Sequence, residues 1–110
     1  NYSIAEPEAE ARLLPLATDK GTAVLVNRPF ADGALFRRTR GRALPEWAKE
    51  FDCASWAQFF LKYVLAPPAV TCAIPATSKP DHAEDNMRGG LGRLPSEAQR
   101  AQMRRLIESL

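Results

Sequence analysis

The stretch that most constrains the fold is a short uncharged segment followed at once by helix-forming sequence, residues 70–86. Val70, Cys72 and Ile74 are apolar and closely spaced, which predicts a strand buried on both faces, as in a parallel sheet. A proline ends this run, and Pro80 suits the first position of a helix because its missing N–H is not needed there. The segment therefore predicts a strand that passes through a polar turn into a helix.

The polar turn between this strand and helix contains groups that can hold a phosphate. Thr77, Ser78 and Lys79 supply two hydroxyls and one ammonium directly before the predicted helix. The backbone N–H groups and the dipole of a helix N-terminus favour an anion at such a place. An ordinary loop with a well-capped helix explains the same residues, and spacing alone favours this simpler interpretation.

Length, charge and cysteine content limit the class of protein. The chain has 110 residues, of which 45% are hydrophobic and 25% charged, as is typical of a globular protein. Its net charge of +2 is too small to indicate nucleic-acid binding, and no apolar run is long enough to span a membrane. Two cysteines, Cys53 and Cys72, are too few for a disulfide framework or a metal cluster, and Cys72 is expected in the core. We therefore expect no metal, nucleic-acid or membrane partner.

The remaining sequence predicts a second strand and, with the helix after residue 80, four helices. Thr22–Asn27 is uncharged and β-branched, which indicates another short strand. Helices are expected over residues 9–20, 47–65 and 95–110, where apolar residues recur at helical spacing. Residues 31–45 are expected to form a loop.

This loop carries the only dense basic cluster, which comprises Arg37, Arg38, Arg40 and Arg42. Only one aromatic residue, Phe36, adjoins it, whereas single-strand binding requires interleaved stacking aromatics. A solvated charge run, or a mobile loop over a ligand site, is the favoured interpretation.

The order of residues in three segments resembles a known family. Ile74-Pro75, Thr77-Ser78-Lys79-Pro80, His82 and Asp85-Asn86 are similar to the last strand and following helix of the aldo-keto reductases. Asn27-Arg28-Pro29 and the sequence from residue 55 to 78 are similar to the preceding strand, helix and strand of that family. The resemblance covers essentially the whole chain, from the end of the sixth barrel strand to the terminal helix.

The resemblance implies an NADP site, with NAD as an alternative. Nine residues would bind the cofactor: Asn27, Arg28, Phe30, Thr77, Ser78, Lys79, His82, Asp85 and Asn86. Residues 77–79 and His82 would face the 2′-phosphate, and Asp85 and Asn86 the adenine. Arg28 and Phe30 would line the pyrophosphate. Asn27 stands where the family usually has an aromatic ring that stacks on the nicotinamide, and His82 where many members have arginine.

The resemblance also implies the fold class, which is α/β. The chain would be part of a (β/α)8 TIM barrel, with about two parallel strands and four helices, whereas a complete barrel needs about 250 residues. Residues 1–110 would form a single C-terminal segment whose N-terminal half is absent. The family's catalytic aspartate, tyrosine, lysine and histidine all come from the first half of the barrel. None can be placed on this sequence, so we assign no catalytic residue.

The favoured interpretation is the C-terminal, cofactor-binding part of an NADP-dependent oxidoreductase that reduces aldehydes or ketones by hydride transfer. The substrate would be a small carbonyl compound in the full-length enzyme, and this chain alone is expected to be inactive. The alternative is a non-enzymatic interaction or scaffold fragment derived from a reductase. Two strands leave unpaired edges, so we expect a homo-oligomer or association with the missing N-terminal half. We expect a cytoplasmic protein, with export as an alternative because a targeting segment would lie upstream.

Overall fold

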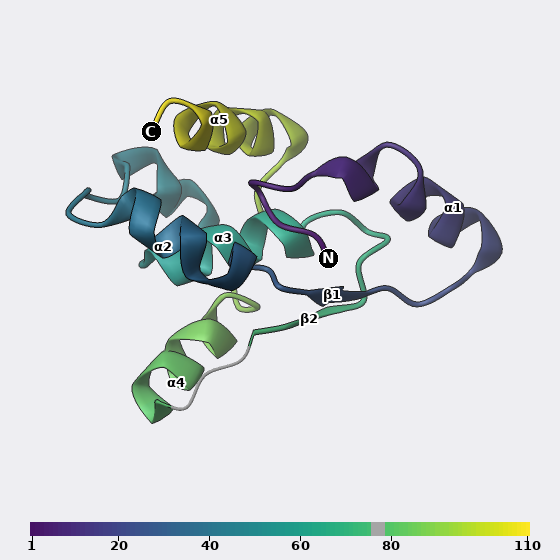
Figure 1. The fold of residues 1–110 in the computed structure, drawn as a ribbon, viewed down its shortest axis with the longest axis horizontal. Coiled ribbons are helices and arrows are strands. Elements are labelled where there is room, and N and C mark those ends of the chain that lie inside the picture. The colour runs from purple at the N-terminus through teal and green to yellow at the C-terminus, as the bar shows by residue number, and fades with distance from the viewer. Residues whose placement is uncertain (76–78) are drawn as a thin grey trace.

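The computed structural model describes residues 1–75 and 79–110, and contains two parallel strands flanked by helices (Figure 1). The elements follow one another as α1 (Leu13–Lys20), β1 (Leu25–Asn27), α2 (Ala34–Thr39), α3 (Trp56–Leu65), β2 (Cys72–Ile74), α4 (Pro80–Arg88) and α5 (Glu97–Glu108). Short 3-10 turns cover Glu8–Glu10, Ala31–Gly33 and Glu46–Phe51. None of the helices in the described ranges is long and apolar enough to cross a membrane.

The two strands pair in parallel, with Leu25 opposite Cys72 and Asn27 opposite Ile74. Successive side chains of a strand point to opposite faces of the sheet. Val26 is 2% exposed and packs in the core, on the side of the strands where α2, α3 and α5 lie (Figure 1). The other face carries Leu25, Asn27, Cys72 and Ile74, all of which are exposed; we call it the open face.

The open face corrects the prediction that the second strand is buried on both sides. Ile74 is 53% exposed and Cys72 is also exposed, so Cys72 is not a core residue. The physical reason is that helices cover one face of the sheet only. The apolar composition of the strand is real, but in this structure two of its three side chains, Cys72 and Ile74, are exposed.

The core is built around α3. Ser55 caps this helix by accepting a hydrogen bond from the Gln58 backbone N–H at 3.1 Å, as the sequence indicates. Phe59 and Phe60 are fully buried, which confirms that the aromatic stripe is core packing. The predicted helical region at 47–65 is interrupted, because Asp52 adopts a left-handed φ of 54° between a 3-10 turn and α3.

Helix α2 lies in the segment that was expected to be a loop. Leu35 is fully buried and anchors the helix, and the Thr39 hydroxyl donates to the Leu35 carbonyl at 3.0 Å. Arg38 donates to the carbonyl of Ile107 at 2.6 Å, near the C-terminal end of α5. The basic segment is therefore partly structural, and its helical part begins directly after the loop that follows β1.

A buried polar group joins the N-terminal segment to α3 and α5. We call it the Glu10 cluster; it consists of Tyr2, Glu10, Tyr63, Arg100 and Arg104. The Glu10 carboxylate accepts hydrogen bonds from Tyr2 at 2.8 Å and from Tyr63 at 3.2 Å, and it is ion-paired with Arg100. Burial raises the pKa of both tyrosines above their usual range. The cluster fixes the ends of the chain against the central helix.

Candidate functional site

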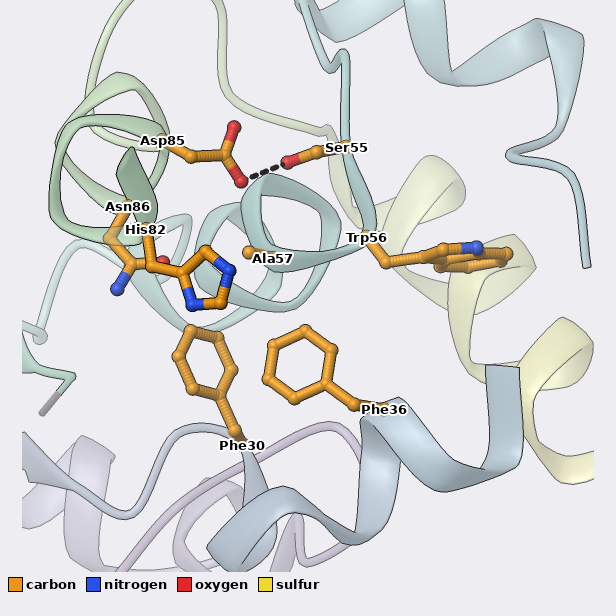
Figure 2. Close-up of a pocket in the computed structure, with 8 residues that line it drawn as sticks. All are labelled: Phe30, Phe36, Ser55, Trp56, Ala57, His82, Asp85 and Asn86. Carbon is orange, nitrogen blue, oxygen red and sulfur yellow. Dashed lines mark hydrogen bonds between the residues drawn. The ribbon is translucent and has the colours of Figure 1, made fainter. Parts of the chain in front are cut away.

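Two adjoining pockets lie at the carboxyl ends of β1 and β2. The first, which we call the strand-end pocket, has a volume of 360 Å³ and is lined by Asn27, Arg28, Pro29, Phe30, Asp32, Gly33, Phe36, Ile74 and Pro75. The second, the α4 pocket, has a volume of 540 Å³ and is lined by Phe30, Phe36, Ser55, Trp56, Ala57, His82, Asp85 and Asn86 (Figure 2). Phe30 and Phe36 line both pockets, so the two spaces share a wall.

The backbone of the strand-end pocket adopts unusual conformations. Arg28, Ala31 and Asp32 have positive φ angles of 55°, 52° and 55°, a region that residues other than glycine rarely occupy. Backbone conformations of this kind are retained where surrounding structure imposes them, often at ligand sites. They turn the chain sharply after β1, so that the loop lies beside the end of the neighbouring strand β2.

Arg28 is the principal charged group of the strand-end pocket. Its guanidinium forms an ion pair with Asp32, and the hydrogen bond to that carboxylate raises the pKa of Arg28. Its Nε atom is buried and has no hydrogen-bond partner within residues 1–75 and 79–110. A buried donor of this kind is costly to leave without an acceptor, so it indicates a place where an acceptor from a ligand would be stabilised.

The α4 pocket has one aromatic wall and one polar wall. Figure 2 shows the Phe30 and Phe36 rings on one side, with His82 and Asn86 of α4 facing them. The two phenylalanine ring centroids are 4.8 Å apart, and Phe36 also packs edge-on against Phe60 at 5.5 Å. An apolar surface opposed by a few polar groups is the usual construction of a site for a small organic molecule.

Asp85 connects α4 to the N-terminus of α3. One carboxylate oxygen accepts a hydrogen bond from the Ser55 hydroxyl at 2.7 Å, which Figure 2 shows, and the other accepts from the Gln58 amide at 2.8 Å. Helix α4 contains no fully buried residue, so these two bonds are a principal tie between it and the core. Each carboxylate oxygen retains a second lone pair that a ligand could use.

Six of the nine predicted cofactor residues line the two pockets: Asn27, Arg28 and Phe30 at the strand ends, and His82, Asp85 and Asn86 on α4. Lys79 is the N-cap residue of α4. Thr77 and Ser78 lie outside the described residues. The structure thus brings together residues that are almost 60 positions apart in the sequence, while their role in cofactor binding stays a prediction.

Sequence reasoning did not assign Phe36, Trp56 or Gln58 to the site. Phe36 could have been found from its position beside the basic segment, if that segment had been recognised as the start of a helix. Trp56 stacks on Phe60 with ring centroids 5.9 Å apart and an interplanar angle of 21°. No local signal indicates that Trp56 and Gln58, just inside α3, would meet residues that follow β2.

Comparisons with known proteins identify the family of the chain. The sequence model of the Aldo/keto reductase family matches residues 1–107. Over 86 residues the chain is 36% identical to a Schizosaccharomyces pombe protein named as an uncharacterized oxidoreductase, which covers 78% of this chain and 27% of that protein. The crystal structure of a thermostable aldo-keto reductase in complex with the inhibitor epalrestat matches with a TM-score of 0.66 and 24% identity. That structural match covers 96% of this chain.

The coverage and identity of each match determine which conclusion it supports. The chain spans 27% of the length of the curated relative and 38% of the crystallised one. At 24% identity, the structural match shows the fold, in which parallel strands alternate with helices. The family match extends over nearly all of the residues, from the first to position 107. The chain therefore belongs to the aldo/keto reductase family, and its two parallel strands with their helices form part of that family's (β/α)8 barrel.

Proposed function

We propose that this chain is the C-terminal, cofactor-binding part of an NADP-dependent oxidoreductase that reduces aldehydes or ketones by hydride transfer. The observation that carries the proposal is the convergence of six family-implied residues on two pockets at the carboxyl ends of parallel strands. In barrel enzymes this end of the strands holds the ligand, and phosphate groups are bound after the last two strands. NADPH, when bound, supplies the hydride.

The two pockets would hold different parts of the cofactor. The α4 pocket presents flat aromatic rings opposite the Asn86 amide, which suits the adenine, since a base can pack on an apolar face while its edge is hydrogen-bonded. Arg28 in the strand-end pocket would pair with the pyrophosphate. The Asn27 side chain would face the nicotinamide end with an amide in place of an aromatic ring. Asp85 would hold the α4 wall in position through its bonds to α3.

The choice between NADP and NAD would depend on the start of α4. His82 is the only histidine of the chain and lines the α4 pocket from the first turn of that helix. The ring N–H of His82 and the ammonium of Lys79 would favour the 2′-phosphate of NADP as hydrogen-bond donors, and NAD is the alternative if they do not reach it.

The open face requires a cover. Leu25 is 59% exposed and Ile74 is 53% exposed on this face, and Met87 on α4 is 76% exposed. A missing N-terminal half of the barrel, or a second copy of this chain, would bury these side chains. The catalytic residues of the family would lie in that N-terminal half, so this chain alone would bind nucleotide weakly and reduce no carbonyl substrate.

The exposed apolar residues also favour the second candidate function, an interaction fragment that uses the open face as a protein contact. Sedimentation with and without nucleotide separates the two. A stable oligomer that is indifferent to nucleotide would support the interaction fragment. An assembly that changes when nucleotide is added would support the cofactor-binding part.

The direct test is calorimetry with 2′,5′-ADP, compared with 5′-AMP and with the variants His82→Ala and Asn86→Ala. We expect binding of 2′,5′-ADP in the millimolar range, weakened by both substitutions, and a smaller effect of His82→Ala on 5′-AMP because that ligand has no 2′-phosphate. An absence of heat at millimolar 2′,5′-ADP would show that the site is not formed in this chain. Reductase turnover by the purified chain would refute its proposed inactivity.

A further inference from the structure

A third pocket lies beside the turn that leads into β2, at the opposite end of that strand from the strand-end pocket. We call it the α1 pocket; its volume is 440 Å³, within the range of about 300–1,000 Å³ that is typical of small-molecule sites. One wall is apolar and is formed by Leu14, Pro15, Pro67, Pro68 and Ala69. The last three precede β2, whereas the strand-end pocket is lined by Ile74, the final residue of that strand. The α1 pocket is therefore separate from the proposed nucleotide site.

Four charged side chains form a second wall of the α1 pocket, and their charges alternate in sign. Glu97 pairs with Arg100 at 3.2 Å. Arg100 pairs in turn with Glu10, and Glu10 pairs with Arg104 at 3.4 Å. The two inner side chains are only 6% and 20% exposed, and each has an opposite charge on both sides. The two outer side chains, Glu97 and Arg104, are 85% and 39% exposed, and each has an opposite charge on one side only. The pocket therefore presents one available acidic group and one available basic group.

The register of α5 separates these two available groups. Glu97 and Arg104 are seven residues apart, which is about two turns, so both lie on the same face of the helix. A rise of about 1.5 Å per residue places their Cα atoms about 10 Å apart along the axis. Arg104 is bonded only at long distance, through its Nη1 atom, to Glu10 at 3.4 Å and to the Tyr63 hydroxyl at 3.5 Å. Its Nε and Nη2 donors have no acceptor in the described part of the chain, so they are available to a ligand.

We propose that the α1 pocket binds a small ω-amino acid, which carries an ammonium group and a carboxylate at the two ends of an alkyl chain. The carboxylate accepts hydrogen bonds from the free donors of Arg104, since a guanidinium matches the two oxygens of a carboxylate. The ammonium group pairs with the exposed Glu97 carboxylate, and the methylene groups lie against the apolar wall. A compound with a single charge satisfies one end only. This site does not depend on the proposed nucleotide function.

The test is calorimetric titration of the chain with 6-aminohexanoate, compared with hexanoate and hexylamine, which carry one charge each. We expect 6-aminohexanoate to bind in the millimolar range. Hexanoate should bind about threefold more weakly, because it lacks the ammonium group that pairs with the exposed Glu97. Hexylamine should bind about tenfold more weakly, because it lacks the carboxylate that takes charge-assisted hydrogen bonds from Arg104. Glycine, which is too short to reach both charged groups, should give no detectable binding.

Substitutions at the two charged groups should have different effects on the two acidic ligands. Arg104→Gln should weaken 6-aminohexanoate about tenfold and hexanoate by a similar factor. Glu97→Gln should weaken 6-aminohexanoate about threefold and leave hexanoate unchanged, because hexanoate makes no contact with Glu97. The matched control is Arg105→Gln, which removes a charge from the same helix at a position that does not line the pocket, and it should leave both affinities unchanged. The exposed Glu97 can be substituted without loss of the fold, so the test does not require Arg104→Gln to be stable.

Any of three results would overturn this assignment. An absence of heat at millimolar 6-aminohexanoate would show that the pocket binds no such compound. Equal affinities for 6-aminohexanoate and hexanoate would show that Glu97 binds no ammonium group. An equal loss of affinity in Arg105→Gln and Arg104→Gln would indicate general electrostatic attraction. Titration with 2′,5′-ADP separates the site from the proposed function, because a chain that binds 2′,5′-ADP but not 6-aminohexanoate would refute the ω-amino acid site alone.

Discussion

Glu10→Gln should strongly destabilise the chain because it removes the negative partner of a buried cation. The Arg100 side chain is 6% exposed and the Glu10 side chain 20% exposed, so solvent screens their ion pair little. Glutamine keeps one acceptor oxygen for the tyrosines, but it removes the negative charge that balances the Arg100 guanidinium. Removing one partner of a buried pair typically costs about 3–5 kcal/mol. We expect about 3 kcal/mol, since Arg100 also lies 4.2 Å from the Tyr63 ring centroid and donates to the Tyr63 carbonyl.

The matched control is Glu97→Gln, which breaks a second ion pair of the same arginine. Glu97 is 3.2 Å from the Arg100 guanidinium, but its side chain is 85% exposed. A pair with one exposed member contributes about 0–1 kcal/mol, so this substitution should change stability little. The contrast between the two variants isolates burial as the cause, because each removes one carboxylate charge from Arg100.

The assay is urea unfolding followed by circular dichroism, at two protein concentrations so that any association is detected. In thermal unfolding, which circular dichroism follows equally well, a loss of 3 kcal/mol would lower the melting temperature by roughly 12–20 °C for a domain of this size. The double variant Glu10→Gln with Arg100→Gln should recover part of the loss, because it leaves no buried charge and keeps an acceptor for the tyrosine hydroxyls. Equal effects of Glu10→Gln and Glu97→Gln, or no recovery in the double variant, would refute the reasoning.

Two further predictions concern the cap of α3 and the response to alkaline pH. Ser55→Ala and Ser96→Ala each remove a helix N-cap, so each should cost about 1 kcal/mol in urea unfolding. Only Ser55→Ala removes a bond to Asp85, so only that variant should weaken 2′,5′-ADP binding in calorimetry; equal affinities would contradict the role of Asp85. Burial raises the pKa of Cys53 from 9.0 to about 11, so the unfolded chain releases the thiol proton first and stability should fall as pH rises above 9. The loss attributable to Cys53 should reach about 2 kcal/mol near pH 10.5 and be absent in Cys53→Ala, as measured by unfolding at pH 8 and 10.5.

The helices and strands that could be predicted are those whose signals are local. Gly21 ends α1 in a left-handed conformation with a φ of 64°, and α1 begins at Leu13, which places Pro15 in its first turn as the sequence requires. The two uncharged, β-branched segments contain the strands β1 and β2. Helix α2 was missed because its signal is tertiary: Leu35 is buried by residues far away in the sequence, and glycines on both sides suggest a loop.

The candidate site also has a part that the sequence predicts and a part that depends on tertiary packing. The order of residues in the family motif predicted which side chains follow β1 and β2, and these line the pockets. Spacing could not reveal that the Asp85 carboxylate would be shared with Ser55 and Gln58, 30 and 27 positions earlier. It also could not show that Arg38, and not Arg37, donates to the carbonyl of Ile107, because adjacent positions on a helix face different directions and only the packing of α2 decides which one meets α5.

The two faces of β1 and β2 differ in burial in a way that their sequence does not predict. Val26 is 2% exposed, but its neighbour Leu25 is 59% exposed, although both side chains are apolar. Strands that face water on one side alternate apolar with polar residues, whereas strands covered on both sides do not. The sequence of β1 and β2 therefore predicts strands that are buried on both faces. The described residues bury only one of these faces. That mismatch is the physical reason to propose a cover for the open face, and sedimentation of Leu25→Lys would test it, because a lysine there should weaken any assembly that buries this face.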